Sequence, residues 1–247
     1  MPTSKAPVPR PNWALFLDID GTLIEIAARP SAVVVPRTLP PLLSAVAERL
    51  GGALALASGR RLDDIDRLMA PYRFPCAAEH GAILRFGDGS ARVQQENRVV
   101  PERLREKLRE AAARWPGASI EEKTFTIVVH YRQAPSRRDE IRAFIGSLIT
   151  GEDFEALPAR MAFEIRHRAL NKGAAVDAFM AEPPFASRVP VFVGDDITDE
   201  DGFRAAEALG GIGVDVRVVF AGEPADVRAW LGTFALQLQA WPHRHNL

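Results

Sequence analysis

The sequence has few cysteines, no long apolar run and no excess of charge of either sign. Its single cysteine, Cys76, rules out a disulfide framework within the chain, and we interpret it as a small buried hydrophobe. The formal net charge of -1 argues against a nucleic-acid footprint or a polybasic membrane patch. No apolar run is long enough to cross a membrane, and residues 1–12 lack the apolar centre of a signal peptide. We therefore expect a soluble, cytoplasmic protein.

Short apolar runs alternate with stretches of helical periodicity along most of the chain. A length of 247 residues, of which 47% are hydrophobic, suits one core domain with a smaller insert. Such alternation predicts a parallel sheet with crossover helices, whose ligand site lies beyond the carboxyl ends of the strands. The predicted strands are 13–18, 53–57, 76–78 and 189–193, and the predicted helices are 40–50, 62–69 and 171–180.

Residues 100–166 follow another pattern, which predicts a small α+β insert. Amphipathic helices are expected at 102–115 and 137–149, and strands include 125–131 and 161–165, in the order α-β-β-α-β-β. The expected organisation is therefore a flexible N-terminus, a core in two parts, the insert and a flexible tail. These segments are 1–12, 13–99 with 167–240, 100–166, and 241–247.

Two acids, Asp18 and Asp20, leave the end of the first predicted strand in the string D-I-D-G-T-L. Burying one carboxylate is costly, and burying two without a cation is worse. Mg²⁺ fits such a place because it takes oxygen ligands. The alternative, a strand end capped by surface acids, suits an isolated D-x-D better than this longer string.

Three further polar groups follow predicted strands or open predicted helices. Ser58 offers a hydroxyl that can hold a phosphate oxygen, although a plain helix N-cap is the alternative. Lys172 offers a compact positive charge, although a lysine alone is more often a solvated surface residue. The acidic loop 194–201 needs a cationic partner unless it is fully solvated.

The ordered set of acid pair, hydroxyl, lysine and acidic loop resembles the haloacid dehalogenase superfamily, from about residue 13 to 230. The resemblance implies an α/β fold, with a Rossmann-like core of parallel sheet and a small α+β cap. It also implies a phosphatase in which Asp18 is the nucleophile and Asp20 the general acid and base. Mg²⁺ would be held by the Asp18 carboxylate, the Asp20 backbone carbonyl and Asp195.

The same resemblance assigns the remaining core residues. Ser58 and Lys172 would hold the transferring phosphoryl group, and Asp196 and Asp199 would support the metal site, directly or through water. Substrate-binding residues would also include three next to these motifs: Gly21, Gly59 and Arg60.

The position and α/β content of the insert resemble the type IIB cap. Several strings resemble the trehalose-6-phosphate phosphatases: E-E-K at 121–123, H-Y-R at 130–132, E-H-G-A at 79–82, F-E-I at 163–165 and N-K-G at 171–173. By that resemblance Glu121, Lys123 and Glu164 contact trehalose hydroxyls. The implied reaction converts trehalose 6-phosphate to trehalose and phosphate, the last step of trehalose biosynthesis. The enzyme would be a monomer, linked functionally to a trehalose-6-phosphate synthase.

Other functions stay open at this point. One alternative is another sugar phosphatase with the same cap, of the sucrose-6-phosphate or mannosylglycerate type. A second is a phosphomannomutase-like phosphotransferase. A third is a non-catalytic module that binds sugar phosphate, although binding alone needs no nucleophile.

His80 and His130 are interpreted as structural residues, and the H-x-H pair His243 and His245 as part of a flexible end. Two departures from the family pattern, His167 in place of a proline and the apolar stretch 216–221, leave the last strands uncertain.

Overall fold

A computed structural model of the chain describes residues 5–27, 32–94, 98–159 and 161–237. The predicted flexible tail, with His243 and His245, and the first four residues lie outside these ranges. The chain folds into two compact units, one formed by 1–92 with 171–247 and the other by 93–170.

The larger unit is built on a seven-stranded sheet among the described residues, in the order β11-β10-β1-β2-β3-β4-β5. The first five of these strands run parallel, as the alternating pattern predicted. β4 pairs antiparallel with β3 and was not predicted. The strands are β1 (Trp13–Leu17), β2 (Leu54–Ala57), β3 (Cys76–Ala78), β4 (Ile83–Arg85), β5 (Ala91–Val93), β10 (Val189–Gly194) and β11 (Ile212–Asp215).

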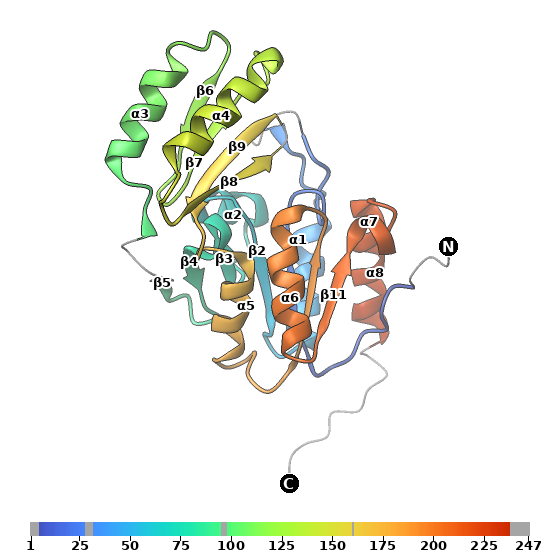
Figure 1. Cartoon of the computed structure of the whole chain (residues 1–247). Coiled ribbons are helices and arrows are strands. Elements are labelled where there is room, and N and C mark those ends of the chain that lie inside the picture. Colours follow the sequence, from blue (N-terminus) through green and yellow to red (C-terminus); the bar gives the residue numbers. More distant parts are fainter. Residues whose placement is uncertain (1–4, 28–31, 95–97, 160, 238–247) are drawn as a thin grey trace. The chain divides into compact units, whose positions relative to one another are not determined.

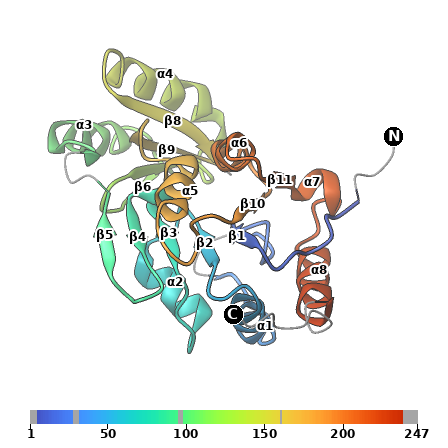
Figure 2. The ribbon, with the colours of Figure 1, turned by 90° about the horizontal axis from the view of Figure 1, so that it is seen from below.

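Helices cover both faces of this sheet, which makes it a doubly wound α/β fold (Figure 2). In that view α5 and α6 lie on one face, and α1, α2 and α8 lie on the other. The turn α7 falls in the apolar stretch after β11, where the family pattern left the elements uncertain. The helices are α1 (Leu39–Arg49), α2 (Leu62–Met69), α5 (Lys172–Met180), α6 (Glu200–Ala208), α7 (Val216–Val219) and α8 (Pro224–Gln237).

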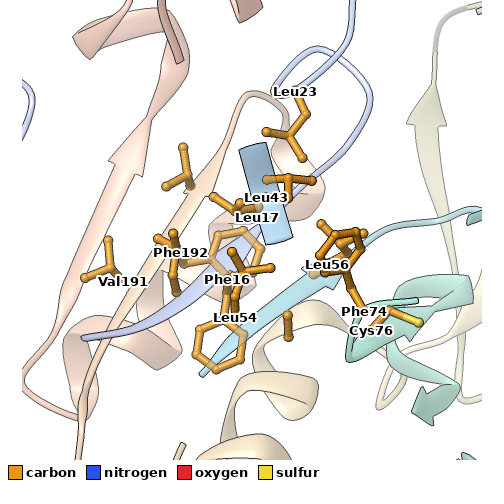
Figure 3. Close-up of a cluster of buried hydrophobic side chains, with 14 of the residues drawn as sticks. Phe16, Leu17, Leu23, Leu43, Leu54, Leu56, Phe74, Cys76, Val191 and Phe192 are labelled. Carbon is orange, nitrogen blue, oxygen red and sulfur yellow. The ribbon is translucent and has the colours of Figure 1, made fainter. Parts of the chain in front are cut away.

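The core of the larger unit forms around the central parallel strands (Figure 3). β1 and β2 are buried at every position, because a parallel strand covered on both faces has no solvent side. Phe16 stacks on Phe185 with ring centroids 5.6 Å apart. Cys76 lies among these apolar side chains, and burial raises the pKa of its thiol to about 12. The interpretation of Cys76 as a buried hydrophobe is confirmed.

The smaller unit has a four-stranded antiparallel sheet among the described residues, in the order β6-β7-β9-β8. Helices α3 and α4 pack on one face of it, over residues such as Ile127, Val129 and Ile165 (Figure 1). The order of elements is α-β-β-α-β-β, as predicted. They are α3 (Glu102–Ala112), β6 (Ser119–Glu122), β7 (Ile127–His130), α4 (Arg138–Leu148), β8 (Phe154–Ala159) and β9 (Ala162–His167).

Helix α3 is shorter than predicted, because it ends at Ala112 while the apolar pattern continues to Trp115. Trp115 still packs in the core of the smaller unit, but from the turn that follows the helix. Apolar periodicity therefore placed the buried residue correctly and the helix end wrongly. None of the helices within the described ranges has the length and apolar character needed to cross a membrane.

Candidate active site

Asp18 directly follows β1, at the carboxyl end of the parallel strands, where a ligand site is expected. The chain then turns tightly at Gly21, whose φ of +87° favours glycine. A Cβ on Gly21 would lie 2.2 Å from Oδ2 of Asp195, which follows β10. Glycine is therefore required at position 21 for two reasons: its backbone angle and the close approach of the Asp195 carboxylate.

Lys172 joins two of the acids. Its Nζ donates to Oδ1 of Asp18 at 2.7 Å and to Oδ1 of Asp199 at 2.6 Å, and all three side chains are buried. Burial alone would lower the pKa of Lys172, but attraction to Asp18 and Asp199 outweighs it and raises the pKa. The lysine is therefore held charged between two carboxylates.

Asp199 orders the acidic loop. Its Oδ2 accepts hydrogen bonds from the backbone N–H groups of Asp195 and Asp196, both at 3.0 Å. Asp196 in turn caps the turn by accepting from the N–H of Thr198 at 2.7 Å and from its hydroxyl at 2.6 Å. A Cβ on Gly194 would lie 2.2 Å from Cγ of Asp199, so glycine is required for this packing.

The acids meet closely enough to bind a cation. Oxygen atoms of Asp18, Asp195 and Asp199 lie within 4.8 Å of one another. Burial raises the pKa of Asp18 well above its usual range, and burial with the neighbouring Asp199 and Asp196 raises that of Asp195 to about 6. The donor set is all oxygen and carries excess negative charge, which fits a hard divalent cation such as Mg²⁺.

Within this group, the carboxylate oxygens of Asp18 and Asp195 accept fewer hydrogen bonds than those of Asp199. Both oxygens of Asp199 already accept hydrogen bonds from Lys172 and the loop backbone. Oδ1 of Asp195 accepts only the hydroxyl of Thr22, at 3.2 Å, among the bonds described for its side chain. Asp199 therefore suits a supporting role, while Asp18 and Asp195 suit direct ligation.

Asp20 is held by Arg60. The guanidinium donates from Nε and Nη2 to the two carboxylate oxygens of Asp20, both at 2.6 Å. Such a bidentate pair fixes the plane of both groups. The backbone N–H of Arg60 donates to Oγ of Ser58 at 3.2 Å, so the Ser58 hydroxyl and Arg60 belong to the same turn after β2.

A turn with unusual backbone angles follows β3 in the same unit. Glu79, His80 and Gly81 are buried and have consecutive positive φ values of 46°, 58° and 96°. For the first two such angles are uncommon, and they concentrate at functional sites. A Cβ on Gly59 would lie 2.5 Å from Nε2 of His80, so the imidazole packs on the turn that carries Ser58 and Arg60.

A second polar group lies on the sheet of the smaller unit. Glu121 on β6 pairs with Val128 on β7, which pairs with Glu164 on β9, so the three share one face. Oε1 of Glu164 accepts from Nζ of Lys123 at 2.9 Å and from the hydroxyl of Thr126 at 2.8 Å. This face is opposite to the one that α3 and α4 cover.

Glu121 has its own partner on this face. Its Oε2 lies 2.9 Å from Nε2 of His130, and that hydrogen bond lowers the pKa of Glu121. His130, interpreted from the sequence as a structural residue, bonds this carboxylate. The hydrogen bond orients a residue that the sequence assigned to sugar binding.

The family model described as Trehalose-phosphatase matches residues 16–227. The chain belongs to the trehalose-phosphatase family. It is 44% identical over 207 residues to a probable trehalose-phosphate phosphatase of Sinorhizobium fredii, covering 83% of this chain and 78% of that one. It is 37% identical over 246 residues to the trehalose-6-phosphate phosphatase of Escherichia coli, covering 96% and 92%.

Among solved structures, the C-terminal domain of Candida albicans trehalose-6-phosphate phosphatase matches with a TM-score of 0.77 at 20% identity, over 92% of this chain and 93% of that one. At that identity the likeness concerns the fold alone. It agrees with the predicted α/β core of parallel sheet and the small α+β insert.

The structure brings the predicted core residues into two contact groups. One group joins Asp18, Lys172, Asp195, Asp196 and Asp199. The other joins Asp20, Ser58 and Arg60. The predicted residues of the smaller unit form a third group on their own sheet.

Sequence reasoning gave no role to two side chains that support these groups: Thr22 bonds Asp195, and Thr126 bonds Glu164. Thr22 stands inside the string D-I-D-G-T-L, so the motif contained a signal for it. Thr126 depends on pairing between distant segments, which the sequence pattern does not give. His80, interpreted from the sequence as a structural residue, packs on Gly59.

Proposed function

We propose that the chain hydrolyses trehalose 6-phosphate to trehalose and inorganic phosphate, through a phosphate ester on Asp18 and with Mg²⁺ as cofactor. The observation that carries the proposal is the Asp18 carboxylate, held by Lys172 beside Asp195 in a chain of this family. In trehalose biosynthesis, this reaction follows the one that a trehalose-6-phosphate synthase catalyses.

The chemistry follows from two carboxylates in different surroundings. Lys172 holds Oδ1 of Asp18, so Oδ2 is the oxygen that attacks phosphorus. As the Asp18–phosphorus bond forms, the bond from phosphorus to the sugar oxygen breaks, and Asp20 donates a proton to that oxygen. Asp20 then takes a proton from a water molecule, which attacks phosphorus and releases phosphate and free Asp18.

Arg60 places a condition on the role of Asp20. Both oxygens of Asp20 are bound to the guanidinium, so Asp20 must break at least one of these bonds to reach the leaving oxygen. We infer that Arg60 keeps Asp20 ordered before the substrate arrives and that a phosphate group competes for the same guanidinium. This gives Arg60 the substrate-binding role expected from the sequence.

The remaining core residues hold the charge of the phosphoryl group. Lys172 supplies one fixed positive charge, and the Ser58 hydroxyl and the Gly59 turn supply hydrogen-bond donors. Bound Mg²⁺ would neutralise the charge that otherwise repels an anionic nucleophile from an anionic ester. Asp18, Asp195 and the Asp20 carbonyl would hold it, with Asp196 and Asp199 supporting the loop.

For the sugar we propose Glu121, Lys123 and Glu164 as the binding residues. Trehalose is uncharged and rich in hydroxyls, so a selective site needs fixed donors and acceptors. The pairing of Glu164 with Lys123 and Thr126, and of Glu121 with His130, fixes these side chains in advance. Fixed polar groups reject sugars whose hydroxyls do not match, because the groups are then left unpaired.

Phosphate release from trehalose 6-phosphate tests the proposal, beside sucrose 6-phosphate and glucose 6-phosphate and with magnesium added or chelated. We expect release from trehalose 6-phosphate to exceed release from the others by at least tenfold and to require magnesium. Faster release from sucrose 6-phosphate would favour the first alternative. Transfer of the phosphate to a second sugar without release of free phosphate would favour the phosphotransferase.

A further inference from the structure

The smaller unit contains a pocket of about 540 Å³ that no step of the proposed reaction uses. It lies between α4 and the edge strand β8, and its volume falls within the range of small-molecule sites. Phe163 lines it, while the next residue, Glu164, carries the sugar-binding role proposed above. Neighbouring residues of a strand point to opposite faces, so Phe163, with Ala156 and Pro158 of β8, lies on the face of the sheet opposite to Glu164.

The rim of this α4–β8 pocket is positively charged. Three arginines, Arg138, Arg142 and Arg168, line it together with a single acid, Glu155. Oε1 of Glu155 already forms an ion pair with Nε of Arg166 at 3.0 Å. Arg166 is buried and does not line the pocket. The charge of Glu155 is thereby offset from outside the pocket, and the three arginines leave the rim with a net positive charge.

The three arginines of the pocket differ in the ion pairs that they form. Arg138 pairs with the exposed Asp139 at 3.2 Å, and an exposed pair of this kind contributes little and is exchanged easily. Arg168 lies 3.7 Å from Glu155. Arg142 forms no ion pair with any residue that the structure describes. An anion in the pocket would therefore meet Arg142 without a competing ion pair and Arg138 in an exposed pair.

The floor of the pocket is apolar. Ile145, Ile149, Pro158 and Phe163 contribute to its lining. An apolar floor with a few charged groups at the rim is the usual composition of a site for an organic ligand, because apolar contact supplies affinity and the charges fix its orientation. A bare inorganic ion would leave the floor unused.

Gly146 gives a second, independent observation. It lies inside α4 and lines the pocket, and a Cβ at this position would meet no atom within 4 Å. Apart from proline, glycine is the least favourable residue in a helix interior, and steric fit within the described residues does not require it here. Gly146 is exposed at the edge of the pocket, and a large side chain at this position has room to extend over it, whereas glycine leaves it open.

We propose that the α4–β8 pocket binds a small organic anion, with a phosphate, carboxylate or sulfonate group on the arginines and an apolar body on the floor. This site is separate from the one that hydrolyses the substrate. It gives the smaller unit a second binding function, on the helix-covered side of its sheet.

The test uses the full chain and the fluorescent probe 8-anilinonaphthalene-1-sulfonate, an aromatic sulfonate of the proposed class. Fluorescence titration should show one saturable site that trehalose does not displace. Gly146→Trp fills the pocket and should weaken binding by roughly tenfold or more, whereas the matched control Gly146→Ala should change it by less than about threefold. Arg142→Glu should also weaken it by about tenfold, because it replaces attraction of the sulfonate by repulsion.

Two controls make the result decisive. Arg114→Glu reverses an exposed arginine of the same unit outside the pocket and should leave binding unchanged. Thermal melting and hydrolysis of p-nitrophenyl phosphate should stay at wild-type levels in every variant, which separates loss of the site from loss of the fold. If Gly146→Trp unfolds the protein, the comparison of probe binding by Arg142→Glu and by Arg114→Glu still tests the proposal.

Three outcomes would overturn the proposal. Undiminished probe binding by folded Gly146→Trp would place the probe elsewhere. Equal losses of probe affinity in Arg142→Glu and Arg114→Glu would show that the effect comes from the net charge of the protein and not from the pocket. Equally tight binding of the uncharged analogue N-phenyl-1-naphthylamine, unaffected by Arg142→Glu, would leave an apolar crevice without anion recognition.

Discussion

The polar group of the larger unit and that of the smaller unit differ in what controls their charges. Around Asp18 and Asp195, burial is the largest influence and raises both carboxyl pKa values. On the smaller sheet, the hydrogen bond from His130 is the largest influence and lowers the pKa of Glu121. The first group accumulates negative charge at a cost that a cation offsets. The second consists of paired side chains that are stable as they stand.

This difference matches the two tasks assigned to the units. A group that reacts with phosphorus needs a desolvated nucleophile and a cation beside it. A group that selects a neutral sugar needs ordered donors and acceptors only. Changes in the first group should therefore affect every phosphate ester, while changes in the second should affect the sugar substrate alone.

The largest effect is expected for Asp18→Asn. Because the amide is a poor nucleophile, phosphate release from every ester should fall by a factor on the order of 10⁴ or more. Circular dichroism and thermal melting should show a folded protein. The control Asp63→Asn changes an exposed acid on α2 and should keep full activity. Near-normal release by Asp18→Asn would contradict the mechanism.

Asp20→Asn should have the next largest effect. Loss of one acid–base group typically slows turnover by about 10²–10⁴-fold, while phosphorylation of Asp18 by an ester with a good leaving group remains possible. Rapid-quench measurement of phosphorylated enzyme with p-nitrophenyl phosphate should show the phosphate trapped on the protein. An unchanged rate on trehalose 6-phosphate across the pH range would remove Asp20 from this role.

Magnesium should stabilise the folded chain through the acids of the larger unit. At a concentration of about 100 times Kd, a ligand that binds only the folded state raises the free energy of unfolding by about 2.7 kcal/mol. Urea unfolding with magnesium or with chelator measures this difference. Asp195→Asn should abolish most of it, while Asp177→Asn, an exposed acid on α5, should preserve it. Equal stabilisation in both variants would place the cation elsewhere.

Changes on the smaller sheet should be selective. Glu121→Ala, Lys123→Ala and Glu164→Ala should each lower kcat/KM on trehalose 6-phosphate by roughly tenfold or more, because each removes a hydrogen bond to a charged group. Hydrolysis of p-nitrophenyl phosphate should stay nearly unchanged. Glu122→Ala is the matched control, because Glu122 follows Glu121 on β6, points to the other face and pairs with Arg109. Equal losses on both substrates would indicate a folding role instead.

The smallest effect concerns stability and pH. The folded-state pKa of Glu121 lies below its ordinary value of 4.5, so its contribution is present above that value and is lost as pH falls through the folded pKa. For a pair this exposed the contribution is about 0–1 kcal/mol. Glu121→Gln should be slightly less stable than wild type at pH 7, and urea unfolding should show the difference shrinking as the pH falls below 4.5. A difference in the free energy of unfolding that does not change with pH would assign it to packing.

The sequence predicted the elements of the larger unit well where strands were short, apolar and followed by turns. β3 and α2 have the predicted bounds, because apolar period and turn residues agree there. In the smaller unit the predicted order included a strand before 161–165, but the pattern set no bounds for β8, where polar residues and Pro158 interrupt it. Pro158 is tolerated because β8 is an edge strand, and only pairing with β9 reveals the extent of the strand.

The sequence by itself determined the kinds of chemical group and the edge of the sheet at which they stand. Asp18, Ser58 and Asp195 each follow an apolar strand, and parallel strands end at one edge. Only the tertiary structure decided which atoms meet. It placed Lys172 between Asp18 and Asp199, joined Asp20 to Arg60 and divided the acids into supports and open ligands. The physical reason is that hydrogen bonds form between atoms within about 3 Å, and crossover folding sets those distances for residues far apart in the chain.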